Sequence, residues 1–135
     1  MAVKDSTSED VHSLNTRAKR LCENVWQHPE TWGQDHAEAH AILKRALKLD
    51  KMNTTTLTNI GAVLSNMGKH KEALKILRKA ELIGTSDRNL FFNIGVVLMD
   101  LSDTTRLNAR DYFELASTME PSIDTFEAYF DPQGH

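Results

Sequence analysis

The sequence has little cysteine, proline or glycine. Cys22 is the single cysteine among 135 residues, so neither an intramolecular disulfide nor a cysteine-based zinc site can form within the chain. A lone thiol is typical of a reducing compartment, and we expect a cytoplasmic protein. The scarcity of proline (3) and glycine (6) excludes collagen-like and linker-like chains.

Long hydrophobic runs and a strong charge of one sign are missing as well. No apolar stretch approaches the ~18 residues that a spanning helix needs, and residues 1–7 lack the apolar core of a secretory signal. We therefore expect no membrane insertion. The net charge of −3 is too mild to indicate nucleic acid as a partner. With 40% hydrophobic residues, the chain suits one compact domain.

Motifs for catalysis and metal binding are also missing. The sequence contains no glycine-rich phosphate loop, no Gly-x-Ser-x-Gly and no His-Glu-x-x-His. His36 and His40 share one face of a predicted helix, but two ligands do not complete a tetrahedral metal site, and we interpret them as surface histidines. We interpret Cys22 as a buried thiol. The sequence predicts no enzyme activity, no cofactor and no metal.

What the sequence does contain is an internal repeat. Ile60-Gly61 recurs as Ile94-Gly95, a shift of 34 residues, and the second half of the unit recurs at shifts of 34 and then 36. We place the two extra residues in the turn at 102–105. The aligned residues are Leu57/Phe91, Asn59/Asn93, Leu64/Leu98, Ala39/Ala73/Ala109, Leu43/Leu77/Phe113 and Ala46/Ala80/Ala116.

The spacing within each unit predicts two packed helices. Leu57, Ile60 and Leu64 step by three and four residues, which places them on one helical face. Gly68 is suited to end that helix, and the alanine-rich face follows on the next one. Glycine inside a helix costs ~1 kcal/mol relative to alanine. We therefore expect Gly61 to lie where the two helices cross closely.

These residues resemble the tetratricopeptide repeat, a 34-residue helix–turn–helix unit, from about residue 36 to 121. The resemblance implies an all-α fold: a right-handed helical-hairpin solenoid of about three repeats, with six helices plus a short C-terminal capping helix. The closing proline of the family occurs only at Pro121, since Lys51 and Thr85 stand at the other two places.

The expected domain boundaries follow from the same units. A single domain spans 8–130, with repeats at about 8–53, 54–86 and 87–121 and a capping segment at 122–130, whereas 1–7 and 131–135 are expected to be flexible. The first unit is degenerate. We expect Thr7 or Ser8 to cap its first helix, a capping box at Asp35–Glu38 to begin its second, and Trp32 to fold back as an end cover.

By the resemblance, the first helices of successive repeats line a concave groove. Phe92, Val96 and Met99 form an apolar stripe that we expect to be exposed and to anchor a ligand, while the asparagines hydrogen-bond its backbone. The alternative is that the closing segment Ile123–Phe130 covers the stripe. The candidate partner-binding residues are Thr58, Asn59, Ala62, Asn66, Asn89, Phe92, Asn93, Val96 and Met99.

These features predict a non-catalytic protein–protein interaction module, an adaptor or small chaperone that binds a peptide or helix of another protein in the groove. The subfamily that grips acidic chaperone tails uses groove cations, whereas those positions hold Thr58, Asn89 and Asn93 here, which argues against that activity. The alternative function is a self-assembling scaffold that forms homo-oligomers through the apolar stripe or through oppositely charged ends.

The outer face carries the charge asymmetry. Residues 36–86 hold nine Lys/Arg against four Asp/Glu, and residues 87–135 hold three against nine. A basic patch can bind an acidic partner, an anionic membrane or RNA, or it can simply be a solvated helix surface. No aromatic residues interleave with the lysines, so we favour the solvated surface and argue against nucleic acid. The basic residues concerned are Lys44, Lys48, Lys71, Lys75, Arg78 and Lys79.

Overall fold

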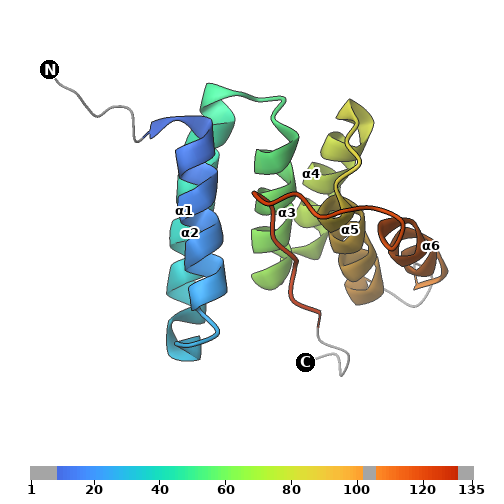
Figure 1. Cartoon of the computed structure of the whole chain (residues 1–135). Coiled ribbons are helices and arrows are strands. Elements are labelled where there is room, and N and C mark those ends of the chain that lie inside the picture. The colour runs from blue at the N-terminus through green and yellow to red at the C-terminus, as the bar shows by residue number, and fades with distance from the viewer. Residues whose placement is uncertain (1–8, 102–105, 131–135) are drawn as a thin grey trace, which may run out of the picture.

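The computed structural model describes residues 9–101 and 106–130, and the regular elements within these ranges are all helical. Six α-helices and one short 3-10 turn follow one another along the chain (Figure 1). They are α1 (Val11–Asn24), η2 (Pro29–Thr31), α2 (Trp32–Leu49), α3 (Thr54–Asn66), α4 (His70–Ile83), α5 (Arg88–Leu101) and α6 (Arg106–Ala116).

The helices pack as three successive hairpins, α1 with α2, α3 with α4, and α5 with α6. Neighbouring hairpins meet through α2 and α3 and through α4 and α5, and α3 also contacts both α1 and α5. The odd-numbered helices therefore form an inner layer. The all-α fold of stacked helical hairpins is confirmed, and each hairpin falls within one of the three expected repeat ranges.

The crossing inside each hairpin depends on glycine. A β-carbon built on Gly61 would lie 2.2 Å from Cδ2 of Leu77, and one built on Gly95 would lie 2.7 Å from Cε1 of Phe113. Such distances are far inside van der Waals contact, so the larger side chain of the second helix fills the notch that the glycine leaves. The expected close crossing at Gly61 is confirmed, and Gly95 repeats it one unit later.

The helix starts differ from the expectation in the first unit. The side chain of Asp10 caps α1 by accepting a hydrogen bond of 2.7 Å from the amide of Ser13, whereas Thr7 and Ser8 lie outside the described residues. The capping box predicted at Asp35–Glu38 is wrong, because α2 already begins at Trp32. The 3-10 turn that starts at Pro29 leads directly into this helix, since proline fixes a φ that suits a first helical turn.

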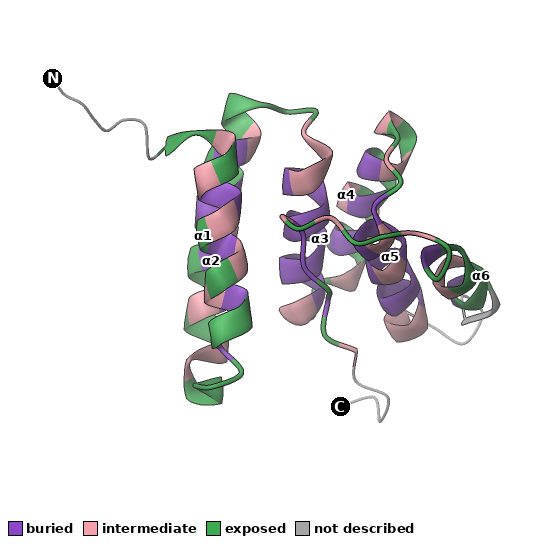
Figure 2. Cartoon of the chain, viewed as in Figure 1, coloured by how far each residue is buried: buried purple, intermediate pink, exposed green. Residues whose placement is uncertain are grey.

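Burial is densest in the inner helices α3 and α5, as Figure 2 shows. Every residue from Thr56 to Ser65 is buried, including the polar ones. A helix at the edge of a stack buries one stripe, whereas α3 is packed by its own partner α4, by α1 and α2 on one side and by α5 on the other. Its remaining face points to the concave side of the molecule.

A segment from the end of the chain lies on that concave side. The short capping helix expected over 122–130 is wrong: a turn at Ile123–Asp124 is followed by extended backbone through Phe130. Figure 1 shows this segment running back from α6 across α5 and α3. A nine-residue helix has little stability of its own, and here side chains of the inner helices bond the backbone groups that a helix would pair internally. The turn at 102–105 that we assigned to the two-residue insertion lies outside the described residues.

Candidate functional site

Residues Ser122–Phe130, called the tail segment below, fill the groove between the inner helices. The segment enters beside Asp87, and Lys19 of α1 donates a hydrogen bond to the carbonyl of Ile123 at the turn. From there it descends between α3 and α5 (Figure 1), in the direction in which α3 itself runs. The groove therefore holds an extended peptide that belongs to the same chain.

Two asparagines hold the backbone of the tail segment. Asn59 donates to the carbonyl of Asp124 at 2.9 Å and accepts from the amide of Phe126 at 3.2 Å. Asn93 donates to the carbonyl of Phe126 at 3.0 Å and accepts from the amide of Ala128 at 2.7 Å. Each side-chain amide thus bonds a carbonyl and the N–H two residues later. These four hydrogen bonds involve only backbone groups of the tail segment, so they do not select particular side chains in it.

The internal repeat generates this pair of clamps. Asn59 and Asn93 occupy the same place in two successive units, 34 residues apart, and their ligands on the tail segment are displaced by two residues. Two residues of the extended tail segment advance about 6.6 Å. This is close to the rise of about 6 Å over four residues of a helix. Asn89, four residues before Asn93, consequently meets Thr125, the tail residue before the second clamp.

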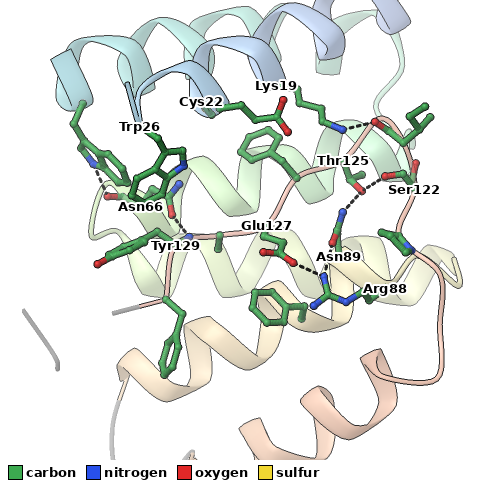
Figure 3. A pocket seen from close by; sticks show the side chains of 18 residues that line it. Lys19, Cys22, Trp26, Asn66, Arg88, Asn89, Ser122, Thr125, Glu127 and Tyr129 are labelled. Atoms are coloured by element: carbon green, nitrogen blue, oxygen red, sulfur yellow. Dashed lines mark hydrogen bonds and ion pairs between the residues drawn. The ribbon is translucent and has the colours of Figure 1, made fainter. Parts of the chain in front are cut away.

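The hydroxyl of Thr125 lies in a buried polar pocket, and the residue as a whole is 2% exposed. The hydroxyl donates to Oδ2 of Asp87 at 2.8 Å and accepts from the side-chain amide of Asn89 at 3.0 Å. Oδ1 of Asp87 also accepts hydrogen bonds from the backbone amides of Asn89 and Ser122. Figure 3 shows the bond between Asn89 and Thr125 at the start of the tail segment. Unlike the two clamps, this pocket distinguishes a hydroxyl-bearing side chain from others.

The far end of the tail segment is bonded through Asn66 and His36. Asn66 accepts from the amide of Tyr129 at 2.7 Å, and its side-chain amide donates to Nε2 of His36 at 3.0 Å. Nδ1 of His36 must then be the protonated nitrogen, since it donates to the carbonyl of Trp32 at 2.8 Å. His36 is fully buried, so its interpretation as a surface histidine is wrong. Burial lowers the pKa of His36, which keeps the ring neutral as these bonds require.

An aromatic cluster closes this end of the groove. The ring of Tyr129 lies 5.3 Å from Trp26 and 5.8 Å from Trp32, and the two indoles are 5.4 Å apart. The indole N–H of Trp32 also donates to the carbonyl of Asn66 at 3.3 Å. Rings at these separations attract one another beyond the effect of buried area alone. The expectation that Trp32 folds back over an end is replaced by a role in this cluster.

Charge and open space mark the side of the tail segment that faces α1. Arg88 pairs with Glu127, and its guanidinium lies 4.7 Å from the ring centroid of Phe92. Beside them a cavity of about 780 Å³ remains, lined by residues of α1, by α5 and by the tail segment (Figure 3). Cys22 borders it, and burial raises the pKa of that thiol to about 12. The groove is thus occupied along its floor and open above it.

The structure distributes the nine candidate residues in three groups. Asn59, Asn66, Asn89 and Asn93 all hydrogen-bond the tail segment, and Phe92 lines the cavity. Thr58, Ala62 and Val96 are buried, and Met99 is half-buried. The expected exposed stripe is therefore wrong, because Val96 has no exposed surface and Phe92 and Met99 are only partly accessible. The closing segment does lie in the groove, where it is bonded by Asn59 and Asn93 and where Phe92 lines the cavity beside it.

Four residues that contribute to the site were not predicted from the sequence. Arg88 follows the turn before α5 without a motif, and His36 lies on an outer helix that the repeat pattern does not place near the groove. Asp87 directly precedes a helix that begins with Arg88, a position that reads as a cap and gives no sign of a ligand role. Asn15 bonds Asn59 from the degenerate first unit, where no aligned copy points to it.

Within 9–101 and 106–130, no group of three or more His, Cys, Asp or Glu side chains gathers where a metal ion could be held. No helix in the described part of the chain has the length and apolar character to cross a membrane.

Comparison with known proteins now adds to the geometry. Residues 54–80 match a family model described as tetratricopeptide repeat, and this stretch contains the crossing of Gly61 with Leu77. The chain is also similar to the BBSome complex member BBS4 homolog of Drosophila melanogaster, with 28% identity over 102 residues, covering 68% of this chain. It spans only 21% of the length of that relative. The repeated glycine crossings, the stacked hairpins and these similarities together support a tetratricopeptide-repeat protein.

Proposed function

We propose that this protein is a non-catalytic adaptor or small chaperone that holds an extended segment of a partner protein in its concave groove, in the cytoplasm. Tetratricopeptide repeats are protein–protein interaction modules, and the proposal adds the conformation of the bound segment. An extended chain fits and a helix does not, because a helix already pairs its carbonyls with its own amides. Asn59 and Asn93 can bond a segment only if its carbonyl and N–H groups are not already paired with each other.

The tail segment carries this proposal, because it occupies the groove in the manner of a bound peptide. Asn59 and Asn93 pair with its backbone through four hydrogen bonds of 2.7–3.2 Å. Recognition of an extended segment through main-chain bonds, with pockets for alternate side chains, is a recurring mode of peptide binding. A groove that holds nine residues of its own chain in this way supports the same mode for a segment from another protein.

A partner would compete with a covalently attached occupant. A short flexible connection gives an attached segment an effective concentration in the millimolar range, so a partner segment of equal intrinsic affinity binds weakly while the tail segment is docked. Replacing a residue of the tail segment weakens the competitor and leaves every groove residue intact. The proposal therefore predicts that partner binding increases when the tail segment is loosened.

Selection from a random peptide library tests this function. The full chain with Ala128→Glu presents an open groove, because Ala128 is only 3% exposed and a carboxylate there opposes docking. We expect peptides to be enriched on this variant. Their binding should be lost when Asn59→Ala and Asn93→Ala are added, since both backbone clamps are then gone. Circular dichroism is the control for helix content in every variant.

The contrary outcomes are equally definite. If no peptide is enriched on a helical Ala128→Glu chain, the groove does not bind extended segments from other proteins. If enriched peptides bind as well without Asn59 and Asn93 as with them, they use another surface, and the assignment of the groove is wrong.

A further inference from the structure

We propose that the partner segment bound by this groove carries a hydroxyl residue followed by a large apolar residue at +1 and an aromatic residue at +4. This is the pattern of Thr125, Phe126 and Tyr129 in the tail segment. The inference rests on the proposed function, and it names the chemistry of the partner. The tail segment is then an internal copy of the ligand that occupies the groove until a partner with the same pattern replaces it.

The hydroxyl position is the most demanding of the three. The Thr125 hydroxyl has its donor and acceptor capacities filled, by Asp87 and Asn89, at a place with almost no access to water. A segment with valine there has the same shape and leaves Oδ2 of Asp87 and the amide of Asn89 without this partner. Buried polar groups left unpaired are costly, so the pocket selects serine or threonine.

The two apolar positions follow from burial and ring contacts. Phe126 is 6% exposed and belongs to the hydrophobic core, so a small or charged residue there forfeits a large buried area. Tyr129 contacts both indoles of the cluster formed by Trp26 and Trp32. That cluster suits any flat aromatic side chain.

The position between them tolerates more variation. Glu127 is exposed and pairs with Arg88, which is itself partly accessible. Ion pairs in such surroundings contribute little, so an acid is favoured at +2 without being required. This position supplies the matched control: Glu127→Gln keeps the size of the side chain and changes only its charge.

Fluorescence anisotropy with a labelled synthetic peptide of residues 121–130 tests the pattern. The receptor is the full chain with Phe126→Asp, which releases its own tail segment and leaves Asp87, Asn89 and both clamps unchanged. We expect the peptide to bind this variant at least tenfold more tightly than the unaltered chain. Should Phe126→Asp lose helix content, Ala128→Pro serves instead, because proline has no N–H to donate to Asn93.

Peptide variants separate pattern from backbone. We expect Thr125→Val to weaken binding by about 10- to 100-fold and Tyr129→Ala by about fivefold to tenfold, with Glu127→Gln within about threefold of the parent. Equal binding of all these peptides would overturn the pattern while leaving the proposed function in place. No binding of any peptide to a helical, opened chain would instead overturn the proposed function.

The groove could also be filled by the tail segment of a second copy of this chain. The mass of the unaltered chain in solution tests this alternative. We expect a monomer by light scattering across a tenfold range of concentration. A dimer that is lost in the Phe126→Asp variant would mean that the tail segment of one copy fills the groove of another. Self-association would then be the use of the pattern, and the proposal of a different partner would be wrong.

Discussion

Replacing Asn93 by alanine should release the tail segment without unfolding the repeats. Asn93 has no exposed surface, and its two partners on the tail segment, the carbonyl of Phe126 and the amide of Ala128, belong to residues that are 6% and 3% exposed. Without the asparagine side chain, both backbone groups lose their partner while they remain shielded from water. Each such group costs about 1–3 kcal/mol, which gives about 2–6 kcal/mol against the docked tail segment.

The chain can avoid this cost by local release. Undocking exposes Phe126, whose burial contributes about 1.5–3 kcal/mol, but leaves the hairpins and their glycine crossings intact. Global unfolding would cost the whole net stability of the domain, about 5–15 kcal/mol. We therefore expect the tail segment to become largely undocked in Asn93→Ala, with the helix content unchanged.

Amide hydrogen exchange measures this outcome directly. A penalty of even 2 kcal/mol should accelerate exchange at Phe126, Ala128 and Tyr129 by about 30-fold, whereas amides inside α3 should change little. The matched control is Asn24→Ala, because Asn24 is exposed at the end of α1. If the three tail amides keep their protection in Asn93→Ala, the clamp does not hold the tail segment and the reasoning from unpaired groups is refuted.

Three further predictions concern the scaffold. Gly61→Ala should lower the free energy of unfolding by about 1–3 kcal/mol, because its β-carbon would collide with the facing helix; Gly33→Ala, with nothing within 4 Å, should raise it by up to about 1 kcal/mol, and equal denaturation midpoints would contradict the close crossing. His36 is kept neutral by burial, with a pKa below its ordinary value. Its contribution to stability should therefore be complete above about pH 6.5 and be lost as the pH falls through the lowered pKa; His36→Gln should flatten that part of the pH–stability curve, and an unchanged curve would count against the bonded neutral ring. Cys22, with its pKa raised to about 12, should react with a thiol reagent at pH 8 far more slowly in the folded chain than in urea, and equal rates would show that α1 does not pack as described.

The hairpins and the groove positions were predictable because a repeat fixes phase. Once Gly61 and Gly95 align, the face that packs and the face that lines the concave side follow from helical geometry. This is why Asn59 and Asn93 could be named as groove residues from the sequence. Their bidentate geometry could not, since the repeat pattern gives the direction of a side chain and says nothing of what will meet it.

The conformation of the tail segment was not predictable from its own residues. Ile123, Phe126 and Phe130 are spaced by three and four, which is a helical period and suggested a capping helix. The competing factor is tertiary: the inner helices offer side-chain amides to backbone groups that an isolated helix would pair internally. A nine-residue segment has too little helical stability to resist such partners. The hydrogen-bonding groups of the inner helices therefore determine the conformation of the tail segment, and its own helical spacing does not.

That surface is preformed because its first clamp is oriented from behind. Asn59 donates one amide hydrogen to Oδ1 of Asn15 at 2.9 Å and the other to the tail segment, which leaves its oxygen facing the amide of Phe126. Asn15 is itself held, because its side-chain amide donates to Thr56 at 2.8 Å and to the carbonyl of Val11. With these bonds in place, the amide of Asn59 does not need to turn when a peptide arrives, so less conformational freedom is lost on binding. The degenerate first repeat, which lacks a clamp of its own, thereby sets the geometry of the clamp in the second.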